Sequence, residues 1–354
     1  MLMRLERMRS RVIPELRRFK AMTRSISFSK GHQWSSIDEF LEDDTFEAGI
    51  HTIPLRFGGQ AQILVVGNLR SLPDSKRIPV FFNGALGERE GTRPPYFSGR
   101  RLLREVEMPG IAVSDPIFDL DSDIKLGWYT GLPEWRYQEQ LGEILQHFSS
   151  ALERDLLTIG GSGGGYAALE AASRLNASAF VWNPQTCILW YRRTFVWKWL
   201  EILFPDTWYL GDNNWKFVRK RFMEPSGLTF DLGLKPPPTR FLCLQNDVDW
   251  HVKLHFTHYV SKHGLTHSEP GLFIDGDDRL AVMSHFGSGT AGHVRPPRSI
   301  IVASLLGMLD KNLTVYQVYE SLLGIIGADE PDLSLLPAKL VPPEFREDYV
   351  VGFE

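Results

Sequence analysis

The segment LLTIGGSGGGYAALEAA, residues 156–172, constrains the fold of this chain more than any other feature. A short apolar run leads directly into a glycine-rich turn and then into helix-forming residues. The turn fits the pattern G-x-S-x-G, with Ser162 at its centre. A serine on a sharp strand-to-helix turn brings its neighbours close to adjoining backbone, so those neighbours must be small. The segment therefore predicts a strand, a tight turn and a helix, with Ser162 as an activated nucleophile.

A glycine-rich turn between a strand and a helix can also cradle a phosphate group. However, GGSGGG lacks the Lys-Ser/Thr pair of a P-loop, and it lies mid-chain rather than in a first βαβ unit. A plain flexible loop would seldom be flanked so closely by strand and helix patterns. The nucleophile is the preferred interpretation, and the backbone N–H of Gly163, at the start of the helix, could receive an oxyanion.

Apolar runs elsewhere predict a mixed sheet with a parallel majority, flanked by helices. Gly58-Gly59 separates two antiparallel strands as a hairpin turn. The expected strands are 50–57, 60–66, 78–82, 110–113, 156–159, 179–182, 241–245 and 272–274. The expected helices are 134–153, 164–175, 251–262 and 299–309.

One long connection interrupts this alternation. Residues 185–235 exceed what a single crossover helix requires, and six of the ten tryptophans lie between 182 and 215. We interpret 185–235 as a helical, aromatic-rich cap, most of whose aromatic residues form its own small core. The full expected division is a basic N-terminal helix and irregular lead-in at 1–47, an α/β core at 48–184 and 236–330, the cap, and a C-terminal surface tail at 331–354.

A nucleophile on such a turn needs an acid and a histidine, in that chain order. The run RFLCLQNDVDWHV places two carboxylates after a strand, Asp247 and Asp249. We favour Asp249 as the acid, with Asp247 as its competitor, and the other would cap the helix that follows. Farther on, His285 and His293 share one loop, and each is a candidate for the base.

These motifs resemble the α/β-hydrolase superfamily from about Ile78 to Leu309, roughly two thirds of the chain. The resemblance rests on the elbow around Ser162, on Asp249-Trp250-His251-Val252, which fits a D-x-x-V pattern, and on the Gly-His turn. It implies Asp249 as the acid and His293 as the base, since prolines follow Gly292-His293 shortly after. It also implies a second oxyanion donor in VFFNGALG, at Ala85 or Gly84. The chain departs from the common lipase pattern because Asn83-Gly84 stands where an HG motif is usual.

The resemblance implies a serine hydrolase that cleaves a carboxylic ester through an acyl-enzyme. An acyltransferase with a hydroxyl or amine acceptor, a peptidase or amidase, and a non-enzymatic binding protein of the same fold are the alternatives. The expected substrate is a small-molecule or glycan ester. Trp190 is expected to line its pocket, and Trp128 and Tyr129 are expected either to line it or to pack in the core.

Charge and composition limit the kinds of binding partner, cofactor and cellular compartment that we expect for this chain. The net charge is −4, which offers no global basic field for nucleic acid. We expect no cofactor and no metal, and we interpret His251, His255 and His258 as surface or subunit-packing residues rather than ligands. Two distant cysteines suit a reducing, cytoplasmic setting. The most apolar stretch, FVWKWLEILF, is too short to span a bilayer, and the N-terminal helix would dock on its own domain or on another subunit of a homo-oligomer.

Overall fold

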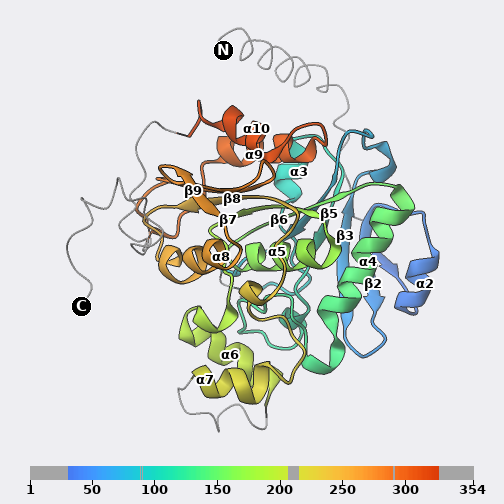
Figure 1. Ribbon diagram of the computed structural model, residues 1–354. Helices are drawn as coiled ribbons and strands as arrows, with labels where there is room; N and C mark the ends of the chain where they lie inside the picture. Colours follow the sequence, from blue (N-terminus) through green and yellow to red (C-terminus); the bar gives the residue numbers. More distant parts are fainter. Residues whose placement is uncertain (1–30, 88, 90, 206–214, 290–291, 327–354) are drawn as a thin grey trace.

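The computed structural model describes residues 31–87, 89, 91–205, 215–289 and 292–326 (Figure 1). The expected basic helix and the C-terminal surface tail therefore lie outside the described residues, apart from the end of the lead-in. Within the described part of the chain, no helix has both the length and the apolar character needed to cross a membrane.

One sheet of eleven strands organises the described part of the chain, in the order β1-β2-β3-β5-β4-β6-β7-β8-β11-β10-β9. The bounds are β1 Gly31–Gln33, β2 Gly49–Pro54, β3 Gln60–Val66, β4 Ile78–Phe82, β5 Gly110–Val113, β6 Leu156–Gly161, β7 Ser178–Trp182, β8 Arg240–Asn246, β9 Thr266–Glu269, β10 Leu272–Asp275 and β11 Arg279–Ser284. The central strands from β5 to β11 are parallel, whereas β3 runs antiparallel to both β2 and β5. The expected mixed sheet with a parallel majority is confirmed.

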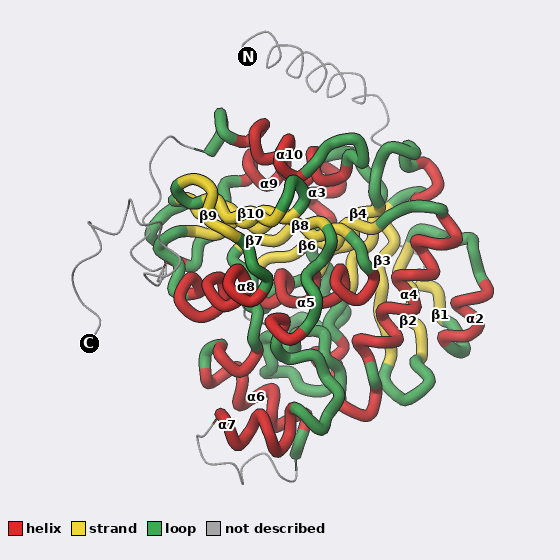
Figure 2. The backbone as a smooth tube through the Cα atoms, in the orientation of Figure 1, coloured by secondary structure: helices red, strands yellow, loops and turns green. Residues whose placement is uncertain are grey.

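Helices cover both faces of the sheet (Figures 1 and 2). Their bounds are α2 Ile37–Glu42, α3 Arg100–Glu105, α4 Tyr137–Leu152, α5 Gly163–Leu175, α6 Arg193–Leu203, α7 Trp215–Val218, α8 Thr257–Lys262, α9 Arg298–Leu309 and α10 Val315–Leu322. Two apolar cores result. One packs α4, α5 and α8 against the sheet, and the other packs α3, α9 and α10 against the opposite face.

The segment between β7 and β8 holds α6 and α7, which lie beyond α5 on the side away from the sheet (Figure 1). Trp199 of α6 is fully buried, and its indole N–H donates to Thr130 Oγ1 at 3.0 Å. Its ring also meets Trp128 edge to face, with centroids 5.5 Å apart. Aromatic packing therefore joins this segment to the core, while its treatment as a separate cap stays a prediction.

Two sequence interpretations need correction. Residues 31–47 are not irregular throughout, because β1 pairs with β2 and α2 begins at the N-cap Ser36, whose hydroxyl accepts from the Glu39 N–H. The strand that leads to the histidine loop is β11, not the expected 272–274 run. β9, β10 and β11 form an antiparallel meander, and β11 then pairs in parallel with β8.

Candidate active site

Ser162 lies on the turn between β6 and α5 with φ 54° and ψ −122°. A residue with a side chain rarely adopts this conformation, so the surrounding bonds must hold it. The Ser162 N–H donates to the Trp182 carbonyl at 3.1 Å, and the Ser162 carbonyl accepts from the Gln185 N–H at 3.1 Å. The serine is half-buried, at the N-terminal end of α5, where the helix dipole favours negative charge.

Glycine is required on both sides of this turn because strand and helix nearly touch. A Cβ added at Gly160 would stand 2.2 Å from the Gly164 carbonyl oxygen, and one added at Gly164 would stand 2.5 Å from the Phe82 carbonyl oxygen. Both obstructions are backbone atoms, which cannot rotate away. The structure therefore contains the sharp strand-to-helix turn, or elbow, that the G-x-S-x-G pattern predicts. By its sheet and its elbow, the chain has an α/β-hydrolase-type fold.

We expect Gly160→Ala to lower the free energy of unfolding by about 3 kcal/mol, because an added methyl must displace the helix from the strand. Chemical denaturation measures this. Gly324→Ala is the matched control, since a Cβ there meets nothing within 4 Å, and it is expected to change stability by less than about 1 kcal/mol. Equal stability of the two variants would contradict the close-approach explanation.

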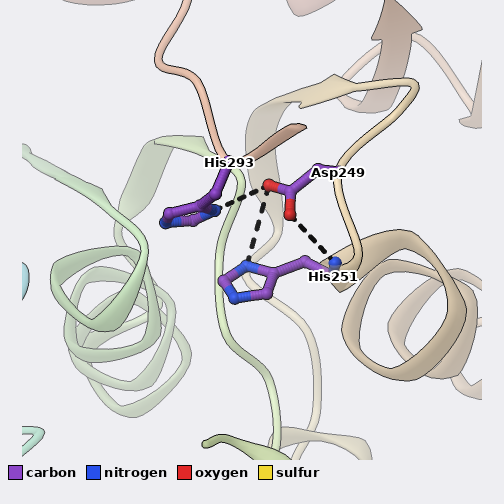
Figure 3. Close-up of side chains that lie close together, drawn as sticks. All are labelled: Asp249, His251 and His293. Carbon is purple, nitrogen blue, oxygen red and sulfur yellow. Dashed lines mark hydrogen bonds and ion pairs between the residues drawn. The ribbon is translucent and has the colours of Figure 1, made fainter. Parts of the chain in front are cut away.

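The structure brings together the three side chains that the sequence suggested for the reaction. Figure 3 shows two of them, Asp249 and His293, with the neighbouring His251. His293 Nε2 is 3.1 Å from Ser162 Oγ, and His293 Nδ1 is 2.7 Å from Asp249 Oδ2. Asp249 is fully buried, and its other oxygen, Oδ1, accepts from the His251 N–H at 3.0 Å. A serine, an imidazole and a buried carboxylate thus form one continuous set of hydrogen bonds.

The competing acid and base pair with each other instead. Asp247 Oδ1 lies 2.9 Å from His285 Nδ1. The carboxylate of Asp247 is buried, while the His285 side chain is 40% exposed. Because the carboxylate bonded to His293 is that of Asp249, the geometry favours Asp249 and His293 over Asp247 and His285.

Two buried asparagines hold the loop that carries His293. Asn246 donates through Nδ2 to the carbonyls of Gly287 and Gly292, and its Oδ1 accepts from the Phe286 N–H. Asn183 donates through Nδ2 to the Val294 carbonyl at 2.7 Å. The loop is therefore fixed on both sides of His293 by residues at the ends of β7 and β8.

One group among the described residues gathers enough donor atoms for a metal ion, namely Asp249, His251 and His293, whose atoms lie within 4.8 Å of one another. The 2.7 Å between His293 Nδ1 and Asp249 Oδ2 is a hydrogen-bond distance. Two ligands of one tetrahedral zinc ion stand farther apart, at about 3.3 Å, given bonds of about 2.0 Å. His251 Nδ1 is also engaged, at 3.1 Å from the Asn183 carbonyl. The arrangement fits a proton relay better than an ion.

The interpretation of the histidines that follow Asp249 also needs correction. His251 and His255 are fully buried, not surface or subunit-packing residues. Burial holds the pKa of His251 far below its usual value and lowers the pKa of His255 to about 3. Neutral imidazoles are therefore expected there, and His255 Nδ1 accepts from the Thr186 N–H. His258 is half-buried and lies 2.9 Å from Asp231 Oδ1.

The loop after β4 lies against the elbow, where the second oxyanion donor was expected. A Cβ added at Gly84 would be 3.0 Å from the Gly161 carbonyl oxygen and 3.7 Å from Ser162 Cβ. The Asn83 N–H is already used, since it donates to the Tyr129 hydroxyl, which in turn donates to the Val113 carbonyl. Gly163 and Ala85, or Gly84, remain the proposed donors.

Of the two roles expected for Tyr129 and Trp128, the structure shows packing in the core and not the lining of a pocket. Their exposed fractions are 2% and 0%, so neither presents a surface to a substrate in this conformation. The Tyr129 hydroxyl holds the Asn83 N–H, and the Trp128 indole N–H donates to Gln185 Oε1. Both side chains hold other residues of the site through hydrogen bonds and do not form the surface of a pocket.

Gln185 is the site residue that the sequence analysis missed. It is fully buried, and its Nε2 lies 3.1 Å from Ser162 Oγ. A usable signal existed, because Gln185 follows β7, the parallel strand beside the nucleophile's strand, at the carboxyl edge of the sheet. Polar residues at that position are expected to face the elbow.

Trp190 lines a different hollow. That open hollow is formed by Trp190, Lys253, Leu254, Thr257, His258, Ser261 and Lys262. It includes none of Ser162, Asp249 and His293. A role for Trp190 in substrate binding stays a prediction.

Asp115 fixes the turn that carries Trp128 and Tyr129. Both of those residues have positive φ, 53° and 57°. The buried Asp115 carboxylate accepts from the N–H groups of Gly127 and Tyr129, each at 3.0 Å, and from that of Ile117. Burial outweighs these bonds and raises the pKa of Asp115 to about 6. The turn behind Gln185 therefore depends on one buried carboxyl group.

A raised pKa in the folded state means that folded protein binds more protons than unfolded protein between about pH 4 and pH 6. The contribution of Asp115 is then greatest below pH 4 and is lost as the pH rises through 6. We expect the difference in unfolding free energy between the wild type and Asp115→Asn to fall by about 3 kcal/mol across that window. Denaturation at several pH values measures it, and a flat difference would contradict the shift.

Comparisons with known proteins give structural neighbours only. No protein-family model and no curated protein sequence matches the chain. It is similar to the capsule O-acetyltransferase of Neisseria meningitidis serogroup A, at 13% identity and TM-score 0.40, over 61% of this chain and 82% of that one. It is also similar to an acetyl xylan esterase from Aspergillus awamori, at 14% identity and TM-score 0.41, over 74% and 100%.

A third neighbour is the Pyrococcus horikoshii acylaminoacyl peptidase, at 15% identity and TM-score 0.46. That match covers 80% of this chain but only 45% of the peptidase. At TM-scores below 0.5, these likenesses say nothing about which reaction the chain performs.

Proposed function

We propose that this chain is a serine hydrolase that cleaves a carboxylic ester or a related acyl bond through an acyl-enzyme. The observation that carries the proposal is the unbroken set of hydrogen bonds from Ser162 through His293 to the buried Asp249. A strained serine at a helix N-terminus, bonded to an imidazole that a carboxylate orients, is the arrangement that activates a hydroxyl group.

In the first half of the reaction, Ser162 Oγ attacks the carbonyl carbon while its proton passes to His293 Nε2. The electron pair of the carbonyl moves to its oxygen, which the N–H groups of Gly163 and Ala85 would receive. Collapse of this intermediate expels the alcohol oxygen, which takes the proton from His293 Nε2. The acyl group is then esterified to Ser162.

In the second half, water attacks the acyl-enzyme and gives its proton to His293 Nε2. Collapse breaks the bond to Ser162 Oγ, which recovers the proton, and the acid is released. Throughout, the Asp249 carboxylate keeps the proton of neutral His293 on Nδ1 and stabilises the imidazolium when it forms. The substrate would be a small-molecule or glycan ester.

Turnover of p-nitrophenyl acetate, with and without added hydroxyl or amine acceptors, tests the assignment. Hydrolysis predicts acetate as the product, at a rate that acceptors leave unchanged. Acyl products formed at the expense of free acetate would replace the hydrolase assignment with an acyltransferase that uses the same residues.

A further inference from the structure

We propose that Gln185, held by Trp128, is a positioning residue that sets the direction of the proton on Ser162. The inference rests on the proposed function, because it concerns the same serine. The Gln185 side chain lies between the Trp128 indole and Ser162 Oγ, and both it and Trp128 are fully buried.

The orientation of the Gln185 amide follows from the chemistry of its neighbours. An indole N–H is a donor only, so the Gln185 atom that faces Trp128 Nε1 must be the acceptor, Oε1. The atom that faces Ser162 Oγ is then Nε2, which can only donate. No second orientation satisfies both contacts, because the flipped amide would set two donors against each other.

A donated bond from Gln185 occupies a lone pair of Ser162 Oγ. The single hydrogen of the serine hydroxyl cannot point at Gln185 and is directed to the other partner within reach, His293 Nε2 at 3.1 Å. His293 must therefore accept at Nε2, so its own proton lies on Nδ1 and is donated to Asp249 Oδ2 at 2.7 Å. The Trp128 indole therefore determines which atom donates in each hydrogen bond of the series that runs through Gln185, Ser162 and His293 to Asp249.

The main chain strengthens this arrangement. The Gln185 backbone N–H donates to the Ser162 carbonyl at 3.1 Å, so Gln185 holds the serine through both its backbone and its side chain. When the acyl-enzyme breaks down, Ser162 Oγ leaves with its bonding electron pair, and the Gln185 N–H is placed to stabilise the charge that develops there.

The first test replaces Gln185 with methionine, which has a similar length and no donor. We expect Gln185→Met to lower kcat for p-nitrophenyl acetate about tenfold to a hundredfold. KM should stay close to the wild-type value, because Gln185 touches the serine and not the substrate. Gln138→Met is the matched control, since Gln138 is also buried and makes two hydrogen bonds, both to Thr229. Loss of activity in both variants, in proportion to lost stability, would overturn the inference.

The second test is a pH profile of Gln185→Glu. The Trp128 indole still needs a bare oxygen as its acceptor. In this variant, a protonated carboxyl group therefore carries its proton on the oxygen that faces Ser162, where it can donate as the amide does. An ionised carboxylate cannot donate, and burial raises the pKa of such a group.

The ratio of Gln185→Glu activity to wild-type activity should accordingly rise as the pH falls. Dividing by the wild-type rate at each pH removes the pH dependence that the two proteins have in common. A ratio that does not change with pH would overturn the inference, even if Gln185→Met fails to fold.

The third test asks whether Trp128 acts through Gln185. We expect Trp128→Phe combined with Gln185→Met to be no less active than Gln185→Met alone, and additive losses would contradict this.

Ser162→Ala separates the two proposals. Wild-type turnover in that variant would overturn the proposed function and the inference together. Turnover that is lost there but unchanged in Gln185→Met would overturn the inference alone.

Discussion

Replacing Ser162 with alanine should lower ester turnover by about 10⁴-fold or more. The variant removes the atom that forms the acyl-enzyme, so the oxyanion donors and His293 can only assist a direct attack by water. Stability should change little, because the turn is held by main-chain bonds to Trp182 and Gln185 that alanine retains. Steady-state kinetics with p-nitrophenyl acetate and a denaturation curve measure the two quantities.

The matched control for Ser162→Ala is Ser173→Ala, a change toward the far end of the same helix, α5. Wild-type turnover is expected there. Full activity in a folded Ser162→Ala would remove this serine from the reaction.

The second large effect concerns the choice between two buried carboxylates. Asp249→Asn should lower kcat about 10³- to 10⁴-fold, because an amide can present its N–H₂ to His293 Nδ1 and move the imidazole proton to Nε2. The imidazole then has no lone pair for the serine proton. Asp247→Asn is the matched control, and it should keep activity within a few-fold of the wild type, since Asp247 is bonded to His285 and the carboxylate bonded to His293 is that of Asp249.

Because both carboxylates are buried, each substitution can cost stability. Denaturation of both variants therefore accompanies the kinetics. A larger loss of kcat in Asp247→Asn than in Asp249→Asn, at comparable stability, would reverse the assignment of the acid.

The sequence was most informative where the constraint is local. The G-x-S-x-G pattern identifies the turn because one of its contacts, Gly160 against Gly164, joins residues only four positions apart, although Gly164 also meets Phe82 of β4. The order of Asp249 and His293 follows from the topology of the sheet, in which each residue leaves the carboxyl edge of a successive strand. Both predictions could be made from the order and spacing of residues along the sequence.

The remaining features depend on packing between distant segments. Nothing in the run LGWYTG distinguishes an aromatic wall from a buried support, and only the contacts of Trp128 with Gln185 and of Tyr129 with Asn83 decide it. The burial of His251 and His255 likewise depends on the neighbouring loop after β7, which supplies Asn183 and Thr186 as partners. β11 was missed because its six residues follow a turn that resembled part of a longer loop.

The most direct test of the central claim is the site of covalent labelling by a fluorophosphonate probe, mapped by peptide mass spectrometry on the full chain. The phosphonyl group bonds to an activated serine oxygen with loss of fluoride. The account predicts a single adduct on Ser162, formed faster in the wild type than in Asp249→Asn. An unlabelled wild type, or an adduct on another residue that persists in Ser162→Ala, would contradict it.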